Sequence, residues 1–420
     1  MTTPHLGRAS VVLFSGGRGG AGIARSLLRV PDVDLSVVIN GYDNGQSTGA
    51  LRRYLPEMLG PSDFRKNLLL HLHGDDPRHA ALKGVLDHRL PVRATRRDLD
   101  DLVDGLAHGK VYGMLPPRAR AAVVRDLSVL TGALDARPGL ELGDCALGNL
   151  VFAGAYLRLG RDFNAAVRSC AEVFESPVRL VNVTGGENAF LVALKKDGRI
   201  LADEADIVAP QDAVAISDLF LLDRPLTPQR RAVLEALPDE HRRRALARGG
   251  AEISFNPEAR DAIMHADLIV YGPGTPHSSL LPSYLTPGVA DAIAAARAVA
   301  KVFVVNIKDD HDVQGLDARA LVGRTLHYLG DPRNERRTVT HVLCHGGPAG
   351  AGPAATADSE DPGVPGDLEN PGDPGDGSGT GARWVTADLE DPRRPGAHSG
   401  DRTVAALARI VGETSLLGAG

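Results

Sequence analysis

A glycine-rich segment near the start of this chain is the first of five stretches whose residues could do chemistry. The segment Ser15-Gly16-Gly17-Arg18-Gly19-Gly20-Ala21-Gly22 follows an apolar run that begins at Val11. Glycines let backbone N–H groups come close to an anion, and a helix that starts behind them adds the positive end of its dipole. The spacing is neither a Walker A loop nor a clean GxGxxG. We interpret the segment as a phosphate or ligand loop; the alternative is a tight turn between a strand and a helix.

A second polar stretch, "VVINGYDNGQSTGALRRYLP" at 37–56, contains the next apolar run and the loop that follows it. Asp43 could hold Mg²⁺ or a ribose hydroxyl, and Asn44 lies beside it in the same loop. The hydroxyls of Ser47 and Thr48, together with Arg52, could meet phosphate. The alternative is an Asx-turn that leads into a helix cap, and loop chemistry alone does not decide between the two.

The third stretch, "GPSDFRKNLLLHL" at 60–72, places charged residues before an apolar helical pattern. In the functional interpretation Asp63 is a second carboxylate, Arg65 is a phosphate clamp and Asn67 is a ligand contact. In the structural interpretation Ser62 or Asp63 is simply the N-cap of the helix.

The last two stretches lie further along the chain. In "LGDCALGNLVFAGAYLRLG" at 142–160, Asn149 could cap a helix or face the ligand. In "ADLIVYGPGTPHSSLLPSYL" at 266–285, a strand pattern ends in Gly272-Pro273-Gly274-Thr275, and His277 follows. This is again a strand–loop–helix arrangement that suits an anion, although His277 could equally be a surface histidine at the helix start. Asn306, near the end of the next apolar run, could line the same crevice.

Composition and the remaining reactive side chains exclude several function classes. The net charge of −6 gives no overall bias toward nucleic acid or an anionic membrane. The three cysteines lack zinc-site spacing, Cys145 has no nearby activating base, and no GxSxG elbow occurs. The first residues do not have the form of a signal peptide, and no apolar stretch is long enough to span a membrane. We therefore expect a reduced, cytoplasmic protein without a covalent nucleophile.

Apolar runs of strand length alternate with helical patterns and must position these loops. The runs are continuous rather than alternating, as in a sheet that is covered on both faces. The expected strands are 11–15, 35–40, 178–182, 190–195, 268–271, 301–307, 339–344 and 384–387. Helical patterns follow the first run at 22–28 and precede the run at 301 over 287–300. The pattern predicts a Rossmann-like α/β fold with a doubly wound, mostly parallel sheet, whose ligands bind at the carboxyl ends of the strands.

Three segments depart from this pattern. Residues 75–142 are helix-rich and predict a helical insertion in a domain that spans 10–345. The helical stretch 228–250 predicts a surface excursion, and its basic run Arg242–Arg244 predicts a solvated face. In 346–381, seventeen of 36 residues are Gly or Pro, seven are acidic and none is basic, which predicts a disordered acidic insertion. Residues 382–413 are expected to add the final strand and helix to the same domain.

Taken together, the five stretches resemble the CofD-like superfamily, which contains 2-phospho-L-lactate transferases and YvcK-type gluconeogenesis factors. The matching segments are "SGGRGG", "YDNGQSTGALR", "GPSDFRKNL", "LGNLVFAGAY" and "YGPGTPHSSLLP", in the order of the family's motifs. The likeness covers most of residues 10–345 and the final strand and helix, and is closer to the YvcK-type branch. It implies a Rossmann-like fold that holds a nucleotide-type ligand, with no role for nucleic acid or membrane. Family members often dimerise, so a homodimer is an expectation too.

The resemblance implies one of two functions, because the superfamily has two branches. In the transferase branch, Mg²⁺ held by aspartates that match Asp43 and Asp63 assists transfer of a phospho-linked unit from a nucleoside-diphosphate-activated donor to a hydroxyl. In the YvcK-type branch, the protein binds a UDP-sugar and regulates metabolism through partners. The retained pair Asp43 and Asp63 favours the transferase as the leading hypothesis. The family's paired aspartates are Tyr42-Asp43 here, which favours the non-catalytic regulator; an orphan enzyme on the same scaffold is a third alternative.

Overall fold

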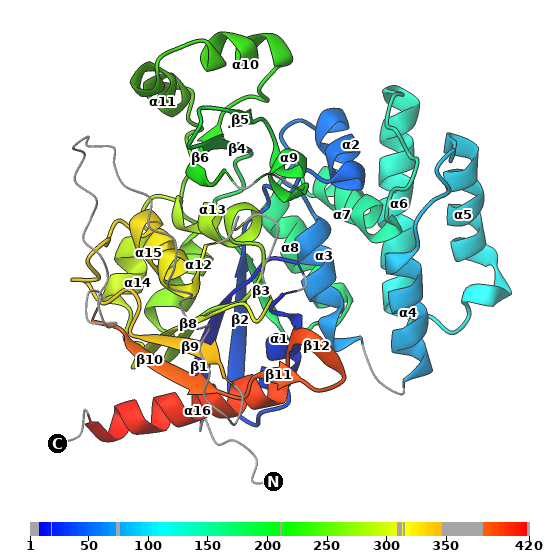
Figure 1. The fold of residues 1–420 in the computed structure, drawn as a ribbon. Helices are drawn as coiled ribbons and strands as arrows, with labels where there is room; N and C mark the ends of the chain where they lie inside the picture. The colour runs from blue at the N-terminus through cyan, green and yellow to red at the C-terminus, as the bar shows by residue number, and fades with distance from the viewer. Residues whose placement is uncertain are drawn as a thin grey trace.

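The computed structural model describes residues 8–417, except residues 18, 73–75, 211, 213, 309–312, 314–315 and 347–380. Its centre is a seven-stranded sheet in which every strand pair is parallel (Figure 1). The strands in chain order are β1 (Ala9–Phe14), β2 (Val33–Ile39), β3 (Arg179–Asn182), β7 (Leu268–Tyr271), β8 (Ala300–Val304), β9 (His341–His345) and β10 (Arg383–Ala387). The expected doubly wound α/β fold is confirmed.

The order of the strands decides where a ligand can bind. Across the sheet the order is β10-β9-β8-β7-β1-β2-β3, so the chain builds outward from β1 in one direction and from β7 in the other. Strands β1 and β7 are direct neighbours, with Phe14 paired to Tyr271 at their carboxyl ends. The connections after these two strands leave in opposite directions, and they open a crevice between the two loops.

Helices from both halves of the chain cover the sheet (Figure 1). Their bounds in the first half of the chain are α1 (Ala21–Leu27), α2 (Gln46–Tyr54), α3 (Ser62–Leu68), η1 (Leu69–His71), α7 (Leu147–Arg158) and α8 (Phe163–Val173). In the second half they are α12 (Pro257–Met264), η3 (Pro276–Leu280), α13 (Leu281–Tyr284), α14 (Val289–Ala295), α15 (Ala318–Tyr328) and α16 (Gly400–Leu417). The central strands are apolar on both faces because both faces are covered; Leu13, Val37 and Val270 have no exposed surface.

One expected strand does not join the main sheet. The run at 190–195 forms β4 (Phe190–Lys195), which pairs antiparallel with β5 (Ile200–Leu201) and β6 (Ile216–Leu222). This three-stranded sheet has a small core of its own, which includes Val192, Leu194 and Leu222. A short apolar run fits a buried strand of either orientation, so the sequence alone does not separate the two cases.

The helical insertion is present beside the sheet (Figure 1). It contains α4 (Pro77–Asp87), α5 (Arg96–His108), η2 (Lys110–Tyr112) and α6 (Pro117–Ala136). Thr95 starts α5 with a capping box, since its hydroxyl accepts from the N–H of Asp98 while the Asp98 carboxylate accepts from the N–H of Thr95. The inward faces of these helices, including Leu99, Leu106 and Leu127, join the main core.

The segment 228–250 forms two helices, α10 (Pro228–Glu235) and α11 (Asp239–Arg248), beside a short helix α9 (Glu204–Val208). The expectation that Arg242–Arg244 is a solvated face is wrong for Arg242, which is buried. Its guanidinium donates to the carbonyl oxygens of Leu234, Glu235 and Leu237 and thereby caps the end of α10.

The C-terminal part returns to the main sheet, as expected. β10 pairs with β9 at the sheet edge, a hairpin follows as β11 (Glu390–Asp391) and β12 (Arg394–His398), and α16 packs on α1. The expected acidic insertion lies outside the described residues, apart from its end residues 346 and 381. Among the helices described, none is long and apolar enough to cross a membrane.

Candidate ligand-binding site

The loops after β1 and β7 touch at the crevice. A Cβ on Gly19 would lie 2.2 Å from the carbonyl oxygen of Pro273 and 2.7 Å from Cα of Gly274. Gly19 therefore allows a backbone approach that no other residue type allows. Asn306 holds the β7 loop from β8, since its side chain donates to the Gly274 carbonyl at 2.9 Å and accepts from the Gly274 N–H at 3.0 Å.

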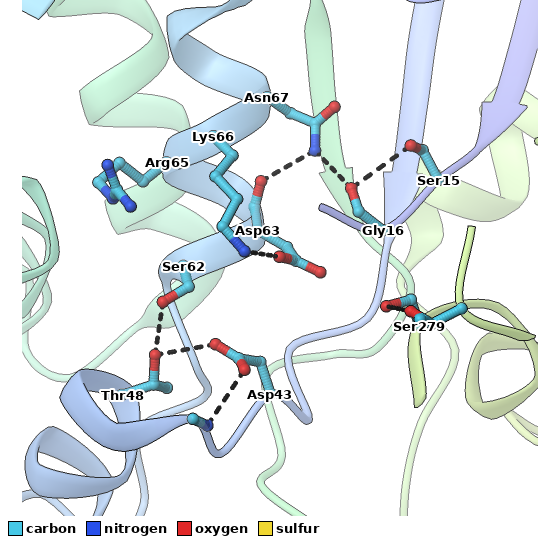
Figure 2. A network of polar contacts seen from close by, with 12 residues as sticks. Ser15, Gly16, Asp43, Thr48, Ser62, Asp63, Arg65, Lys66, Asn67 and Ser279 are labelled. Atoms are coloured by element: carbon cyan, nitrogen blue, oxygen red, sulfur yellow. Dashed lines mark hydrogen bonds and ion pairs between the residues drawn. The ribbon is translucent and has the colours of Figure 1, made fainter. Parts of the chain in front are cut away.

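The other side of the same glycine loop faces α3. A Cβ on Gly17 would lie 2.9 Å from Oδ1 of Asp63 and 3.1 Å from Nζ of Lys66. Lys66 and Asp63 form an ion pair at 2.8 Å (Figure 2). A Cβ on Gly16 would collide with Ser279, which comes from η3 after β7. Three of the five sequence stretches thus meet at the glycine loop.

Asp43 lies next to this cluster in a network of hydroxyls. Its Oδ2 accepts from Thr48 Oγ1 at 2.8 Å and its Oδ1 accepts from the Gly45 N–H at 3.2 Å (Figure 2). The Thr48 hydroxyl also bonds to Ser62, the first residue of α3. The network links the second stretch to the third and fixes the Asp43 carboxylate near that of Asp63.

Glu204, on α9 beside the small antiparallel sheet, brings a third carboxylate to this region. Its Oε2 accepts from the Asn44 N–H at 3.4 Å. Burial, reinforced by the negative charges of Asp43 and Asp63, raises the pKa of Glu204 to about 8. Burial also raises the pKa of Asp63; Lys66 opposes this shift, and Asp43 reinforces it. The carboxylates here therefore repel one another, and a bound cation would stabilise all three.

Arg65 points away from Asp63 and holds the scaffold together. It is buried on α3 and is paired with Asp87 of α4, and its Nε donates to Oδ1 of Asn149 at 3.0 Å. Asn149 in turn donates to Ser62 Oγ at 3.0 Å. Where a phosphate clamp was expected, the structure places Arg65 as a positioning residue, and Asn149 supports it rather than facing a cavity.

Several other predicted residues also act as supports. Asn67 is fully buried, and its amide donates to the carbonyl oxygens of Gly16 at 2.8 Å and Asp63 at 2.9 Å. Arg52 donates to the carbonyl oxygens of Tyr42 and Asp43 and so braces their loop instead of reaching a phosphate. His277 is fully buried in η3, which rules out the alternative of a surface histidine at the helix start.

A cavity of about 370 Å³ opens at the crevice. We call it the basic cavity. The glycine loop, the β7 loop, Asn306 and the C-terminal hairpin enclose it; its charged lining residues are Arg25, Lys308 and Arg394. None of the described residues that line it is acidic. His398, which also lines it, is anchored through Nε2 to the carbonyl oxygen of Val305 at 3.0 Å.

The other predicted site residues fall into three groups: those that line the basic cavity, those at the carboxylate cluster, and those that make contacts within the β7 loop. Those that line the basic cavity are Gly19, Gly274 and Asn306. Those at the carboxylate cluster or its hydroxyl network are Gly16, Gly17, Asp43, Asn44, Ser47, Thr48 and Asp63. Gly272 packs against the carbonyl of Phe14, and Thr275 bonds to Ser279 within the β7 loop. Arg18 lies outside the described residues.

A magnesium ion would find two carboxylates here rather than a complete cage. No group of three His, Cys, Asp or Glu side chains within the described part of the chain is arranged to hold a metal. Mg²⁺ usually takes one or two carboxylates and completes its shell with water and ligand phosphates. Asp43 and Asp63 fit that requirement, because Asp63 is buried and the neighbouring Asp43 raises its pKa, a cost that a bound cation would offset.

Comparison with known proteins identifies the family of the chain. The family model described as "2-phospho-L-lactate transferase CofD" matches residues 11–362. The chain belongs to the CofD family. Its matched segment contains most of β1, all of β2 and β7, and all five sequence stretches, but it ends before the β11–β12 hairpin that lines the basic cavity.

Within the CofD family the chain is similar to gluconeogenesis factors. It is 24% identical to the gluconeogenesis factor of Bacillus subtilis over 76% of this chain and 71% of that protein. It is 24% identical to that of Halalkalibacterium halodurans over 81% of this chain and 79% of that protein. A solved structure of a UPF0052-family protein from Bacillus halodurans superimposes with a TM-score of 0.62 at 20% identity, covering 95% of this chain and 98% of that one. The last likeness supports the fold.

Sequence reasoning missed four charged residues of the site. Glu204, Lys308 and Arg394 lie outside the five sequence stretches, and only the folded chain brings them to the crevice. Arg25 had a weak signal, because it follows the glycine loop by one turn of α1 and so faces whatever that loop binds.

Proposed function

We propose that this CofD-family protein binds a nucleotide-type phosphorylated ligand in the basic cavity. The observation that carries the proposal is the lining of this 370 Å³ space, which includes glycine-loop backbone, Asn306 and three cationic side chains and, among the described residues, no acidic side chain. The volume suits a nucleotide-sized molecule. The position, at the start of α1 and between β1 and β7, is where dinucleotide-binding folds hold phosphates.

The residues would divide the work of binding by their chemistry. Backbone N–H groups at the start of α1 would donate to phosphate oxygens, and Arg25 and Arg394 would neutralise their charge. Asn306 would keep the β7 loop open, because both of its side-chain polar atoms are committed to Gly274. Lys308 lies against Gly396 of the hairpin and would contribute a further cation at the mouth.

The relatives named gluconeogenesis factors support a role in carbon metabolism. The corresponding proposal for this chain is a cytoplasmic factor of that type, which binds a ligand of the UDP-sugar class. The replacement of a family aspartate by the buried Tyr42 supports this assignment, since a tyrosine there offers no carboxylate to a metal. A homodimer belongs to the same proposal.

A magnesium-dependent transferase is the second candidate, favoured by the convergence of Asp43 and Asp63. Mg²⁺ bound by these two carboxylates would supply charge neutralisation at the phosphates of a nucleoside-diphosphate-activated donor. Lys66 is paired with Asp63 beside Gly17, so it would bring a further positive charge to the same phosphates. The protein would orient a hydroxyl acceptor against the donor and exclude water.

A thermal-shift panel of GDP, GTP and UDP-sugars, with and without Mg²⁺, tests these proposals. A ligand held at 100 times its dissociation constant should add about 2.7 kcal/mol of stability. Stabilisation by a UDP-sugar without Mg²⁺, lost in Arg394→Gln and kept in the surface variant Arg97→Gln, supports the binding factor. Mg²⁺-dependent stabilisation by a guanine nucleotide, lost in Asp43→Asn, supports the transferase. A flat response to every nucleotide contradicts both.

A further inference from the structure

A second opening adjoins the basic cavity along α1. This groove of about 410 Å³ lies between α1, the β11–β12 hairpin and the start of α16. It shares Gly22, Arg25 and Arg394 with the basic cavity, so the two spaces are continuous at these residues. We call it the arginine groove, because Arg29 and Arg393 also line it.

The arginine groove has an excess of positive charge that its own carboxylates do not cancel. Its charged lining consists of four arginines and two aspartates, Asp391 and Asp401. Asp401 pairs with Arg29, and Asp391 pairs with Arg394 at 3.0 Å. These two ion pairs tie the hairpin and α16 to fixed positions, while Arg25 and Arg393 have no ion pair within the described part of the chain.

Arg25 lies at the junction of the two spaces, and its side chain has no anionic partner among the described residues. No hydrogen bond or ion pair is found for its side chain among the described residues, and its Nε is buried without a partner. Burial lowers the pKa of Arg25, and the neighbouring Arg394 and Arg29 lower it further. A guanidinium that is partly desolvated beside two others is stabilised by an oxyanion that bridges them.

The backbone around the arginine groove is built for close contact. A Cβ on Gly400 would lie 2.1 Å from the carbonyl oxygen of Gly22 and 2.4 Å from Oγ of Ser26. The start of α16 therefore presses directly on α1, and it fixes the wall of the groove opposite the hairpin. The 18 residues of α16 direct the positive end of their dipole to the same place.

We infer that the ligand carries a second anionic group, of the phosphoryl class, which extends past Arg25 into the arginine groove. Arg25 would bridge the two anionic groups, and Arg29 and Arg393 would hold the outer one. This inference rests on the proposed function for the position of the inner group. It assigns a recognition role to the hairpin, which lies beyond the residues that the CofD family model matches.

Base-free polyphosphates test the inference on the full-length protein by isothermal titration calorimetry. Tetrapolyphosphate should bind at least about tenfold more tightly than pyrophosphate, because only the longer chain reaches the outer arginines. The double variant Arg29→Gln/Arg393→Gln should lose this gain and should bind pyrophosphate as the wild type does. Arg25→Gln should weaken both probes.

A matched double variant separates recognition from general charge effects. Arg97→Gln/Arg333→Gln removes the same charge from side chains that are 90% and 85% exposed and lie outside the groove. An equal loss of tetrapolyphosphate affinity in both double variants would overturn the inference. A wild type that binds both probes equally also overturns it, and leaves the proposed nucleotide site standing. Tetrapolyphosphate binding that depends on Arg29 and Arg393, with no response to any nucleotide, would keep the groove and refute the proposed function.

Discussion

Gly17 and Asp63, from two distant segments, lie so close that a Cβ on Gly17 would come within 2.9 Å of the Asp63 carboxylate. This contact joins the loop after β1 to the helix α3. Lys66 forms an ion pair with Asp63 at the same place. The two sides of the glycine loop consequently contact different parts of the site. Gly17 faces the carboxylate cluster, whereas Gly19 faces the β7 loop and the basic cavity.

The close approach at Gly19 yields the first prediction. In Gly19→Ala the new Cβ meets backbone atoms of Pro273 and Gly274 that cannot rotate away, so the β7 loop must move. We expect unfolding free energy to fall by about 1–3 kcal/mol and the nucleotide-induced thermal shift to disappear. Chemical denaturation and the thermal-shift panel measure the two effects.

Gly132→Ala in α6 is the matched control. A Cβ there meets nothing within 4 Å, so the substitution should be neutral or should stabilise the helix by about 0.4–1 kcal/mol. Normal ligand binding by Gly19→Ala would contradict the position of the ligand at this loop.

The carboxylate cluster makes stability depend on pH. The pKa of Glu204 is raised from 4.5 to about 8 in the folded protein, so its contribution is fully present below pH 4.5 and is lost as pH rises to about 8. Glu204→Gln removes this contribution. We expect the melting temperature of the variant to fall less than that of the wild type between pH 5 and pH 8. Glu335→Gln, at a 75% exposed side chain, should follow the wild type.

Arg65 tests whether a buried charge is a support or a clamp. Asp87→Ala leaves the buried Arg65 guanidinium without its carboxylate and should cost about 3–5 kcal/mol of unfolding free energy. Arg65→Met leaves only the half-exposed Asp87, which keeps Lys83, and should cost about 1–3 kcal/mol. Urea denaturation of both variants checks this order. A loss of ligand affinity of 100-fold or more in Arg65→Met, at wild-type folding, would restore the clamp.

The sequence predicts the main sheet well because a strand that is buried on both faces appears in the sequence as a continuous run of apolar residues. A continuous apolar run such as Leu268–Tyr271 can be recognised as a buried strand without knowing which strands lie beside it. The loops at their carboxyl ends are predictable for the same reason, since the strand order brings Gly17, Asp43 and Gly274 to one edge.

The other residues of the site have no recognisable pattern in the sequence around them. Glu204 and Arg394 reach the crevice through a small antiparallel sheet and a hairpin, whose positions follow from tertiary packing. Arg65 misleads for a related reason, because an arginine beside an aspartate has the same local pattern whether it binds phosphate or Asp87. His277 likewise lies at an expected helix start, yet the π turn of η3 buries it completely.

His398 links the basic cavity to acid stability. Burial lowers the pKa of His398 from 6.5 to about 4, and the nearby His345 acts in the same direction, whereas the hydrogen bond from Nε2 to the Val305 carbonyl opposes the shift. The neutral ring therefore contributes stability that is present above pH 6.5 and is lost as pH falls toward 4. In His398→Gln this loss should be smaller, so the melting temperatures of variant and wild type should converge between pH 6.5 and pH 4.5. His108→Gln, at a 79% exposed side chain, should keep the wild-type profile. A parallel offset of His398→Gln across that range would mean that the ring is not held neutral, and that the hairpin is anchored by packing alone.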